Sequence, residues 1–253
     1  MKKVVLGLSG FLLAISINAA KLNSIPKWYY NIKNISKQKE AFFKILKPLI
    51  IKENLKIKRE REFVIEFFET FYKEPILDNF RLKKIIMLAK KYKIKNIFNK
   101  NEYLKKIDTI PISLVLAQAA LESGWGKSRF AKEANNLFGE WTFGKRGIIP
   151  KDRDEGKNHK IKVFNSISES IASYMLNLNR HPAYKEFRLA RFRAKRKGEP
   201  FDGLKAAKTM QRYSQLGEKY NRLLISIIKK NRSMLLKKTK DQPLLSFELD
   251  SVQ

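Results

Sequence analysis

The sequence predicts a mainly α-helical fold that carries one small β-hairpin flap. Apolar residues recur at helical spacing over most of the chain, for example at Phe42, Leu46, Leu49 and Ile50. A single segment, residues 139–164, is instead rich in Gly, Lys and Asp and ends in an alternation of apolar and basic residues. The chain contains no cysteine, so packing alone must hold the fold.

Length and composition indicate a folded protein of one or two domains. The 253 residues suffice for one substantial domain with an appendage, or for two small domains. A hydrophobic content of 43% argues against wholesale disorder. The formal net charge of +30 would suit a nucleic-acid partner, but the basic residues are spread along the chain. We therefore interpret them as solvated helix faces and expect no nucleic-acid partner.

Residues 1–20 have the pattern of a secretory signal peptide. Lys2 and Lys3 precede an uncharged apolar run from residue 4 to residue 17, which is short for a membrane span. Ala19 and Ala20 suit a cleavage site. The alternative is an uncleaved membrane anchor. Either interpretation predicts an exported chain in the periplasm or cell envelope, away from DNA.

Residues 21–107 are predicted to form a helical N-terminal region. Lys, Ile, Leu and Phe dominate this stretch, and Phe63, Phe67, Phe68 and Phe71 continue the helical spacing. The outer faces of these helices are basic, and the stretch contains no glycine-rich phosphate loop. We expect no catalytic constellation here.

A second segment opens near residue 108, and its first helix ends beside an acid. Pro111 suits the first turn of a helix. Leu114, Ala117, Ala120 and Leu121 fall on one stripe, and Gly124 can end the helix. Glu122 is therefore expected in the last turn or at the C-cap.

The flap and a further set of helices follow. Ile161 and Val163 alternate with lysines, which predicts a hairpin or a flap of two to three strands. Ser166 and Glu169 form a capping box at the start of the next helix. More helices are expected around residues 184–194, 203–213 and 217–231. Residues 233–253 lack a clear pattern, and we expect a mobile C-terminal tail.

Glu122 has the features of a general acid. A carboxylate at a helix C-terminus faces the negative end of the helix dipole, and apolar neighbours disfavour its charged form. Both effects raise its pKa, as a group that protonates a sugar oxygen requires. The alternative is an ordinary surface glutamate near a helix end.

The residues after Glu122 suit a carbohydrate. The amides of Asn135 and Asn136 can bind hydroxyl and acetamido groups, and aromatic faces at Phe138, Trp141 and Phe143 can pack on sugar rings. About half of these aromatic residues could equally belong to the core. Trp125 is expected to be a structural wedge behind the glutamate.

Four stretches carry a family resemblance: "AQAALESGWGKSRFA", "NNLFGEW", "KVFNSISESIASYMLNLNRHPAY" and "YSQLGEKY". They resemble the glucosaminidase domain of glycoside hydrolase family 73, and closely its Bax-type branch. The resemblance covers about residues 108–232, and the helical leader from about residue 24 is also similar. It implies a lysozyme-like α fold with a β-flap over the cleft. It also implies cleavage of β-1,4-linked N-acetylglucosaminyl bonds in peptidoglycan.

The resemblance also implies roles for individual residues. Glu122 matches the general acid, and Tyr213 matches a tyrosine that closes the cleft. The family commonly has Y-A-T-D there, whereas this chain has Tyr-Ser-Gln-Leu and lacks the neighbouring acid. The expected substrate-binding residues are Asn135, Asn136, Phe138, Trp141 and Tyr174.

A second carboxylate in the family lies in the flap, and four acids compete for that place. Glu155 is favoured because it precedes Gly156 at an expected turn; Asp154 and Asp152 follow, and Glu140 ranks lowest. Glu155 could equally be a solvated loop acid. Either this carboxylate activates a water, or the acetamido group of the substrate supplies the nucleophile. No metal or cofactor is expected.

Two other functions compete with the hydrolase. A lytic transglycosylase uses one glutamate on the same kind of fold, but its G-L-M-Q-type stretch is absent here. A non-catalytic basic envelope protein would bind anionic polymers through its charge. The expected partners are peptidoglycan glycan strands and an anionic envelope surface, and the chain is expected to be a monomer.

Overall fold

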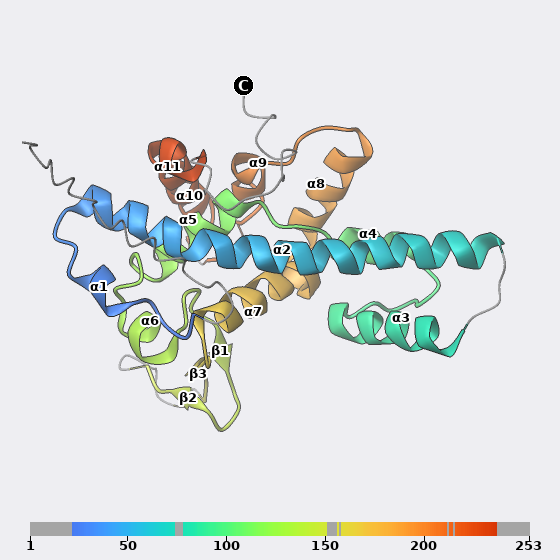
Figure 1. Cartoon of the computed structure of the whole chain (residues 1–253), viewed down its shortest axis with the longest axis horizontal. Helices are drawn as coiled ribbons and strands as arrows, with labels where there is room; N and C mark the ends of the chain where they lie inside the picture. Colours follow the sequence, from blue (N-terminus) through green and yellow to red (C-terminus); the bar gives the residue numbers. More distant parts are fainter. Residues whose placement is uncertain are drawn as a thin grey trace, which may run out of the picture.

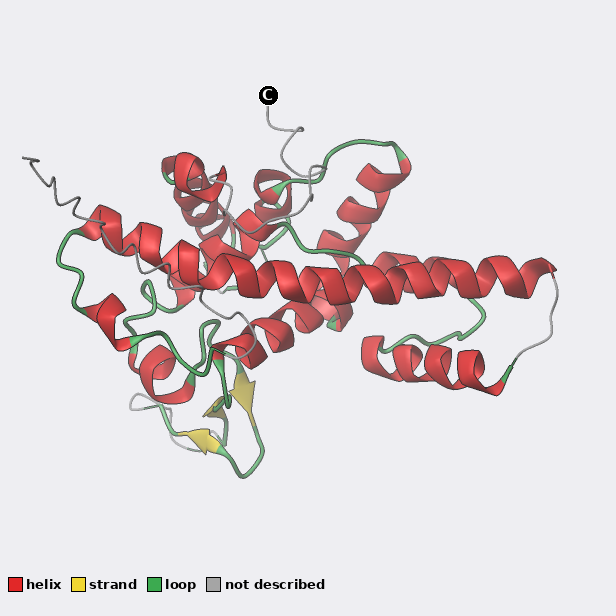
Figure 2. Cartoon of the chain, in the orientation of Figure 1, coloured by secondary structure: helices red, strands yellow, loops and turns green. Residues whose placement is uncertain are grey.

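The computed structural model is mainly helical, with one small sheet against its flank (Figures 1 and 2). It describes residues 22–73, 78–150, 156, 158–211, 213–214 and 216–236. The predicted fold class, helical with a small β-flap, is confirmed. The elements in chain order are α1 (Lys27–Tyr30), α2 (Ile35–Lys73), α3 (Asn79–Tyr92), α4 (Lys100–Lys106), α5 (Ile112–Glu122), α6 (Arg129–Ala134), β1 (Trp141–Thr142), β2 (Gly147–Ile148), β3 (Lys160–Lys162), α7 (Ile167–Arg180), η1 (Pro182–Tyr184), α8 (Lys185–Arg196), α9 (Gly203–Ala207), α10 (Glu218–Lys230) and α11 (Arg232–Leu236).

Helix α2 is the longest element, and it runs across the whole view in Figure 1. Its 39 residues span about 58 Å at the rise of an α-helix. Phe42, Leu46, Ile50, Val64 and Phe68 lie on its buried face. This face packs against α4, α5 and α7, so the N-terminal region supports the segments that carry the site.

Helix α5 is buried on all sides. Its residues 114–120 are all buried, although the sequence predicted a single apolar stripe. The alanines on α5 lack bulk, which lets α9 and α10 pack closely against it. Gln118 is the polar exception inside this helix, and its side chain is paired with tyrosines described below.

The flap is a three-stranded antiparallel sheet with the order β1-β3-β2. Trp141 pairs with Ile161, and Gly147 pairs with Lys162. A Cβ added at Gly147 would lie 2.6 Å from the Cβ of Lys160, so the tight pairing of β2 with β3 requires glycine there. The predicted hairpin or small flap is confirmed.

One hydrophobic core joins the N-terminal helices to the helices that follow residue 108. Residues of α2, α5, α7 and α10 belong to the same buried cluster. No helix among the described residues is long and apolar enough to cross a membrane. The expected signal peptide, residues 1–20, lies outside the described residues.

The C-terminal end is ordered further than the sequence suggested. The tail was predicted to start at residue 233, yet α11 extends to Leu236. Leu235 is buried, and its carbonyl accepts a hydrogen bond from the Lys47 ammonium at 2.9 Å. The rest of the expected tail, residues 237–253, lies outside the described residues.

Candidate active site

Glu122 is the last residue of α5, as predicted. Its Oε1 accepts a hydrogen bond from the Tyr220 hydroxyl at 2.7 Å. Burial raises the pKa of Glu122 above its ordinary value, and the Tyr220 hydrogen bond opposes part of that rise. The expected direction of the pKa shift is therefore confirmed, with burial as the main cause.

Tyr220 belongs to a buried series of hydrogen-bonded side chains that ends at Glu122. The Gln118 amide donates to the Tyr220 hydroxyl at 2.9 Å, and the Tyr174 hydroxyl donates to the other end of Gln118. The three side chains come from α5, α7 and α10. This series fixes the Tyr220 hydroxyl as a donor towards Glu122, because its acceptor lone pairs already face Gln118.

Tyr213 lines the same place but does not reach the carboxylate. Its hydroxyl donates to the Phe138 carbonyl at 3.0 Å, and its ring stacks on Tyr220 at 5.2 Å between centroids. Burial, with help from the Tyr220 hydroxyl and the Glu122 charge, raises the pKa of Tyr213 well above its ordinary value. Sequence reasoning chose Tyr213 and missed Tyr220, although both belong to "YSQLGEKY".

Tyr184 is within electrostatic reach of two acids. Its ring centroid is 6.0 Å from that of Tyr213, and the side chain is half-buried. Burial raises the pKa of Tyr184 to about 12, and the charges of Glu140 and Glu122 add to the rise. The two glutamates therefore act on one shared region.

Glu140 is the one candidate for the second carboxylate that falls within the described residues; Asp152, Asp154 and Glu155 lie outside them. Its Oε2 accepts from the Ser173 hydroxyl at 2.8 Å, and that hydroxyl accepts from the Lys162 ammonium at 3.0 Å. Its Oε1 is buried and has no hydrogen-bond partner among the described residues. Burial raises the pKa of Glu140 against the opposing effects of Ser173, Lys162 and Arg180.

The predicted substrate amides are structural in this arrangement, which corrects their expected role. Asn136 is buried, and its amide donates to the carbonyls of Glu140 and Lys162 at 2.9 Å each. Its Oδ1 accepts from the backbone N–H groups of Phe138 and Glu140. Asn135 ends α6 with a left-handed backbone and donates to the Phe164 carbonyl. These amides hold the base of the flap because they add side-chain hydrogen bonds to backbone groups where the strands are short.

Phe138 and Tyr174 were expected to contact substrate, but both are core residues. Their rings stack with centroids 3.8 Å apart, and their exposed fractions are 3% and 2%. The Asn136 turn directs Phe138 inwards onto α7. Trp141 differs: it is 62% exposed and stacks on His159 at 4.3 Å. Of the predicted aromatic platform, Trp141 is available to a sugar, as is the exposed Phe143.

Trp125 is the structural wedge that the sequence predicted. Its ring packs against Phe42 and Phe43 of α2, and its carbonyl accepts from the Tyr29 hydroxyl at 2.6 Å. Its backbone has a φ of +59°, which is uncommon for a bulky residue. The turn after Glu122 is thus held in place by the N-terminal helices.

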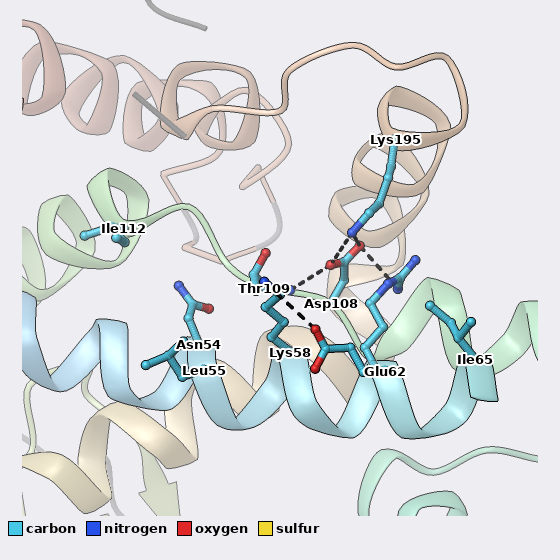
Figure 3. Close-up of a pocket in the computed structure, with 10 residues that line it drawn as sticks. Asn54, Leu55, Lys58, Glu62, Ile65, Asp108, Thr109, Ile112 and Lys195 are labelled. Carbon is cyan, nitrogen blue, oxygen red and sulfur yellow. Dashed lines mark hydrogen bonds and ion pairs between the residues drawn. The ribbon is translucent and has the colours of Figure 1, made fainter. Parts of the chain in front are cut away.

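A pocket of about 400 Å³ lies elsewhere, at the N-terminal end of α5 (Figure 3). Asp108 is buried there between Arg61 at 3.3 Å and Lys195 at 3.0 Å. Glu122 is at the opposite end of α5, about 16 Å along the helix. The pocket includes none of the predicted site residues. Its lining is formed by Asn54, Leu55, Lys58, Arg61, Glu62, Ile65, Asp108, Thr109, Ile112 and Lys195.

The described residues contain no group of three or more His, Asp or Glu side chains that could hold a metal ion. His181 is exposed, and its Nδ1 accepts from the Ala183 N–H at 3.2 Å. His159 lies under Trp141. The side chains described above at Glu122 offer carboxyl, hydroxyl and amide groups.

Comparisons with known proteins identify one family model and several relatives. The sequence model of the glucosaminidase family, described as mannosyl-glycoprotein endo-beta-N-acetylglucosaminidase, matches residues 99–233. Protein bax of Escherichia coli K12 is 33% identical over 226 residues, covering 87% of this chain and 79% of that protein. The peptidoglycan hydrolase FlgJ of the same strain is 35% identical over 88 residues, 30% of this chain and 28% of that protein. The solved, C-terminally truncated glycoside hydrolase domain of Salmonella typhimurium FlgJ is 25% identical, covers 49% of this chain and 85% of that domain, and aligns with a TM-score of 0.36.

Proposed function

Because the chain belongs to the glucosaminidase family and is a glycoside hydrolase, we propose that it cleaves β-1,4-linked N-acetylglucosaminyl bonds in peptidoglycan, with Glu122 as general acid. The observation that carries the proposal is the Glu122 carboxyl group at the end of α5, with a pKa raised by burial. The FlgJ relatives, named as peptidoglycan hydrolases, support the choice of substrate.

The proposed chemistry begins with the protonated Glu122. Its proton moves to the glycosidic oxygen while the bond from that oxygen to the anomeric carbon breaks and an oxocarbenium-like centre forms. Glu122 is then a carboxylate, and the Tyr220 hydroxyl at 2.7 Å stabilises that charge. A water adds to the anomeric carbon and loses one proton, which restores the acid in the net reaction.

The second carboxylate of the proposal is Glu155, which would take the proton of that water from the flap. Glu140 is the rival, since its charge and that of Glu122 both act on Tyr184. However, the raised pKa of Glu140 favours its protonated form, which is a poor base. We assign Glu140 to positioning: through Ser173 and Lys162 it ties the flap to α7. A substrate acetamido group is the alternative nucleophile.

The proposed place of action is outside the cytoplasmic membrane, in the periplasm or cell envelope. The support is the signal-peptide pattern of residues 1–20. Peptidoglycan glycan strands are the proposed partner there, and the chain is proposed to act as a monomer. The non-catalytic alternative loses its support because the chain belongs to a glycosidase family.

Zymography on cell-wall material with Glu122→Gln tests the proposal. We expect a loss of about 10²–10⁴-fold, the usual contribution of general acid catalysis, with a retained fold by circular dichroism. Glu133→Gln is the matched control, because this glutamate is exposed on α6 and close in sequence. Activity of Glu122→Gln above a tenth of wild type would contradict the assignment.

Mass spectrometry of the released fragments tests the kind of reaction. A glucosaminidase leaves N-acetylglucosamine at the new reducing end and adds one water per cut. A lytic transglycosylase leaves an anhydro-sugar without adding water. Anhydro products from the wild-type chain would replace the hydrolase proposal with the transglycosylase.

A further inference from the structure

The basic charge of the chain is concentrated in one place more than the sequence suggested at first. Residues 79–106 contain ten Lys or Arg and a single acid, Glu102. This stretch comprises α3, the loop after it and α4. All three lie along the C-terminal half of α2, whereas α6 and the sheet lie near its N-terminal half (Figure 1).

Helix α3 buries one face and presents the opposite face to solvent. The buried face is formed by Ile85, Leu88, Ala89 and Tyr92. The outward stripe, which we term the α3 face, consists of Phe80, Lys83, Met87 and Lys90. At 3.6 residues per turn these four positions fall within an arc of about 80°. Phe80 is 73% exposed and Met87 is 68% exposed, so two large apolar side chains lie between lysines in water.

Among the described residues, the acids of this region form ion pairs with basic residues other than the lysines of the α3 face. Nearby acids are engaged by other residues: Arg81 pairs with Glu66 and Asp78, and Lys91 pairs with Glu60. Lys100 pairs with Glu69, and Lys106 pairs with Glu102. Within the described part of the chain, Lys83 and Lys90 form no ion pair, and neither do the exposed Lys93 and Lys95 that follow. Their charge is therefore directed outwards.

We propose that the α3 face docks the protein onto the anionic surface of a phospholipid membrane. Phe80 and Met87 would enter the interfacial region, and Lys83 and Lys90 would reach the lipid phosphates while their stems lie on apolar surface. Polybasic segments beside anionic leaflets gain attraction with each added cation. A sugar ring of a wall polymer could pack on Phe80, but only a lipid interface offers an apolar layer to Phe80 and Met87 together with phosphates for the two lysines, so the combination favours lipid.

The position of the α3 face suits such a role. It belongs to a part of the molecule that contributes no residue to the Glu122 site, so docking leaves that site free. Tyr72 and Phe98, which are 63% and 51% exposed, add apolar surface at the same end of α2. The proposal does not depend on the chemistry of Glu122, because binding and catalysis are measured separately.

Co-sedimentation with vesicles tests the proposal on the full exported chain. The vesicles are phosphatidylcholine alone or with phosphatidylglycerol, and the two test variants are Phe80→Ser with Met87→Ser, and Lys83→Glu with Lys90→Glu. The matched controls are Ile35→Ser with Leu216→Ser, and Lys197→Glu with Lys208→Glu, which change exposed residues outside α3. Circular dichroism verifies the folding of every variant, and all of them carry the same N-terminus.

We expect the wild type to bind anionic vesicles at least ten-fold more strongly than neutral ones, and to lose binding as salt rises. Each α3 variant should bind anionic vesicles at least ten-fold more weakly, while the controls stay within two-fold. Activity on a soluble chitooligosaccharide should not change. The proposal is overturned if the α3 variants bind like wild type, if the controls fall equally, or if wild type does not prefer anionic vesicles. If the wild type does not bind vesicles, and the α3 variants bind purified wall sacculi more weakly than the wild type does, the α3 face is assigned to the wall instead.

Discussion

Tyr220 controls how readily Glu122 gives up its proton. Burial raises the pKa of Glu122, and the hydroxyl of Tyr220 lowers it again by donating to the carboxylate. The working pKa is therefore a balance between a desolvated site and one directed donor. Gln118 holds that donor in place from within α5.

Tyr220→Phe should move the alkaline limb of activity to higher pH. The variant loses the hydrogen bond that lowers the pKa of Glu122, so the acid stays protonated to a higher pH. The measurement is the pH profile of kcat/KM on a soluble glycan. Tyr213→Phe is the control, because its hydroxyl donates to the Phe138 carbonyl and not to Glu122. A limb that moves to lower pH, or moves equally in both variants, contradicts the role of Tyr220.

The raised pKa of Glu122 should also make the stability of the protein depend on pH. A carboxyl group whose pKa is raised on folding favours the native state below its unfolded value of about 4.3, and this contribution is lost as pH rises through the raised pKa. Glu122→Gln removes the cost of burying a charge. Its Tm should match wild type at pH 4 and exceed it at pH 8. A constant Tm difference across that range, by calorimetry, would show that the Glu122 pKa is not raised.

Individual residues show which parts of the candidate site could be predicted from the sequence and which could not. Glu122 was found because its position at a helix end is set by neighbours within a few residues. Tyr220 was missed because its contact with Glu122 spans 98 positions, and only packing of α10 on α5 creates it. Phe138 and Asn136 were assigned to substrate because a sequence pattern does not reveal which way a short turn directs them.

Among the secondary-structure elements, the flap is held more by the side-chain amide of Asn136 than by hydrogen bonds between its own short strands. Its strands contain only two or three residues each, so few ladder bonds hold it. Asn136 adds hydrogen bonds to both Glu140 and Lys162, and the Glu140–Ser173–Lys162 chain fastens the same corner to α7. The sequence predicted the strands from alternation, but it could not show that a buried asparagine closes the sheet.

Asn136→Ala should loosen the flap while leaving the helices intact. The variant leaves buried backbone groups unpaired, which costs about 1–3 kcal/mol for each unsatisfied group. Hydrogen exchange should become faster in residues 140–148 and 160–162 and stay unchanged in α5. Asn101→Ala, an exposed asparagine on α4, is the control. Equal protection of the flap in both variants would show that Asn136 does not hold it.

In the protein as a whole, the N-terminal helices belong to the architecture of the candidate active site. The sequence separated residues 21–107 from residues 108–232 because their compositions differ. The structure joins them, since α2 packs on α5 and α7 within one core. Composition indicates helices but not which helices share a core, so the support of the turn after Glu122 by α1 and α2 could not be predicted.

Two tyrosines of α1 provide that support. Tyr29 is fully buried, and its hydroxyl donates to the carbonyl of Trp125, three residues after Glu122. Tyr30 donates to the next carbonyl, that of Gly126.

Tyr29→Phe removes one hydrogen bond from a turn with a strained backbone, so we expect a loss of about 1 kcal/mol in the free energy of unfolding. Because small displacements of a catalytic group reduce turnover, kcat should fall several-fold while KM changes little. Tyr72→Phe is the matched control, since this tyrosine is exposed at the far end of α2. Denaturant unfolding and steady-state kinetics measure both effects, and a Tyr29→Phe variant that loses stability but keeps full kcat would restrict the N-terminal helices to a purely structural role.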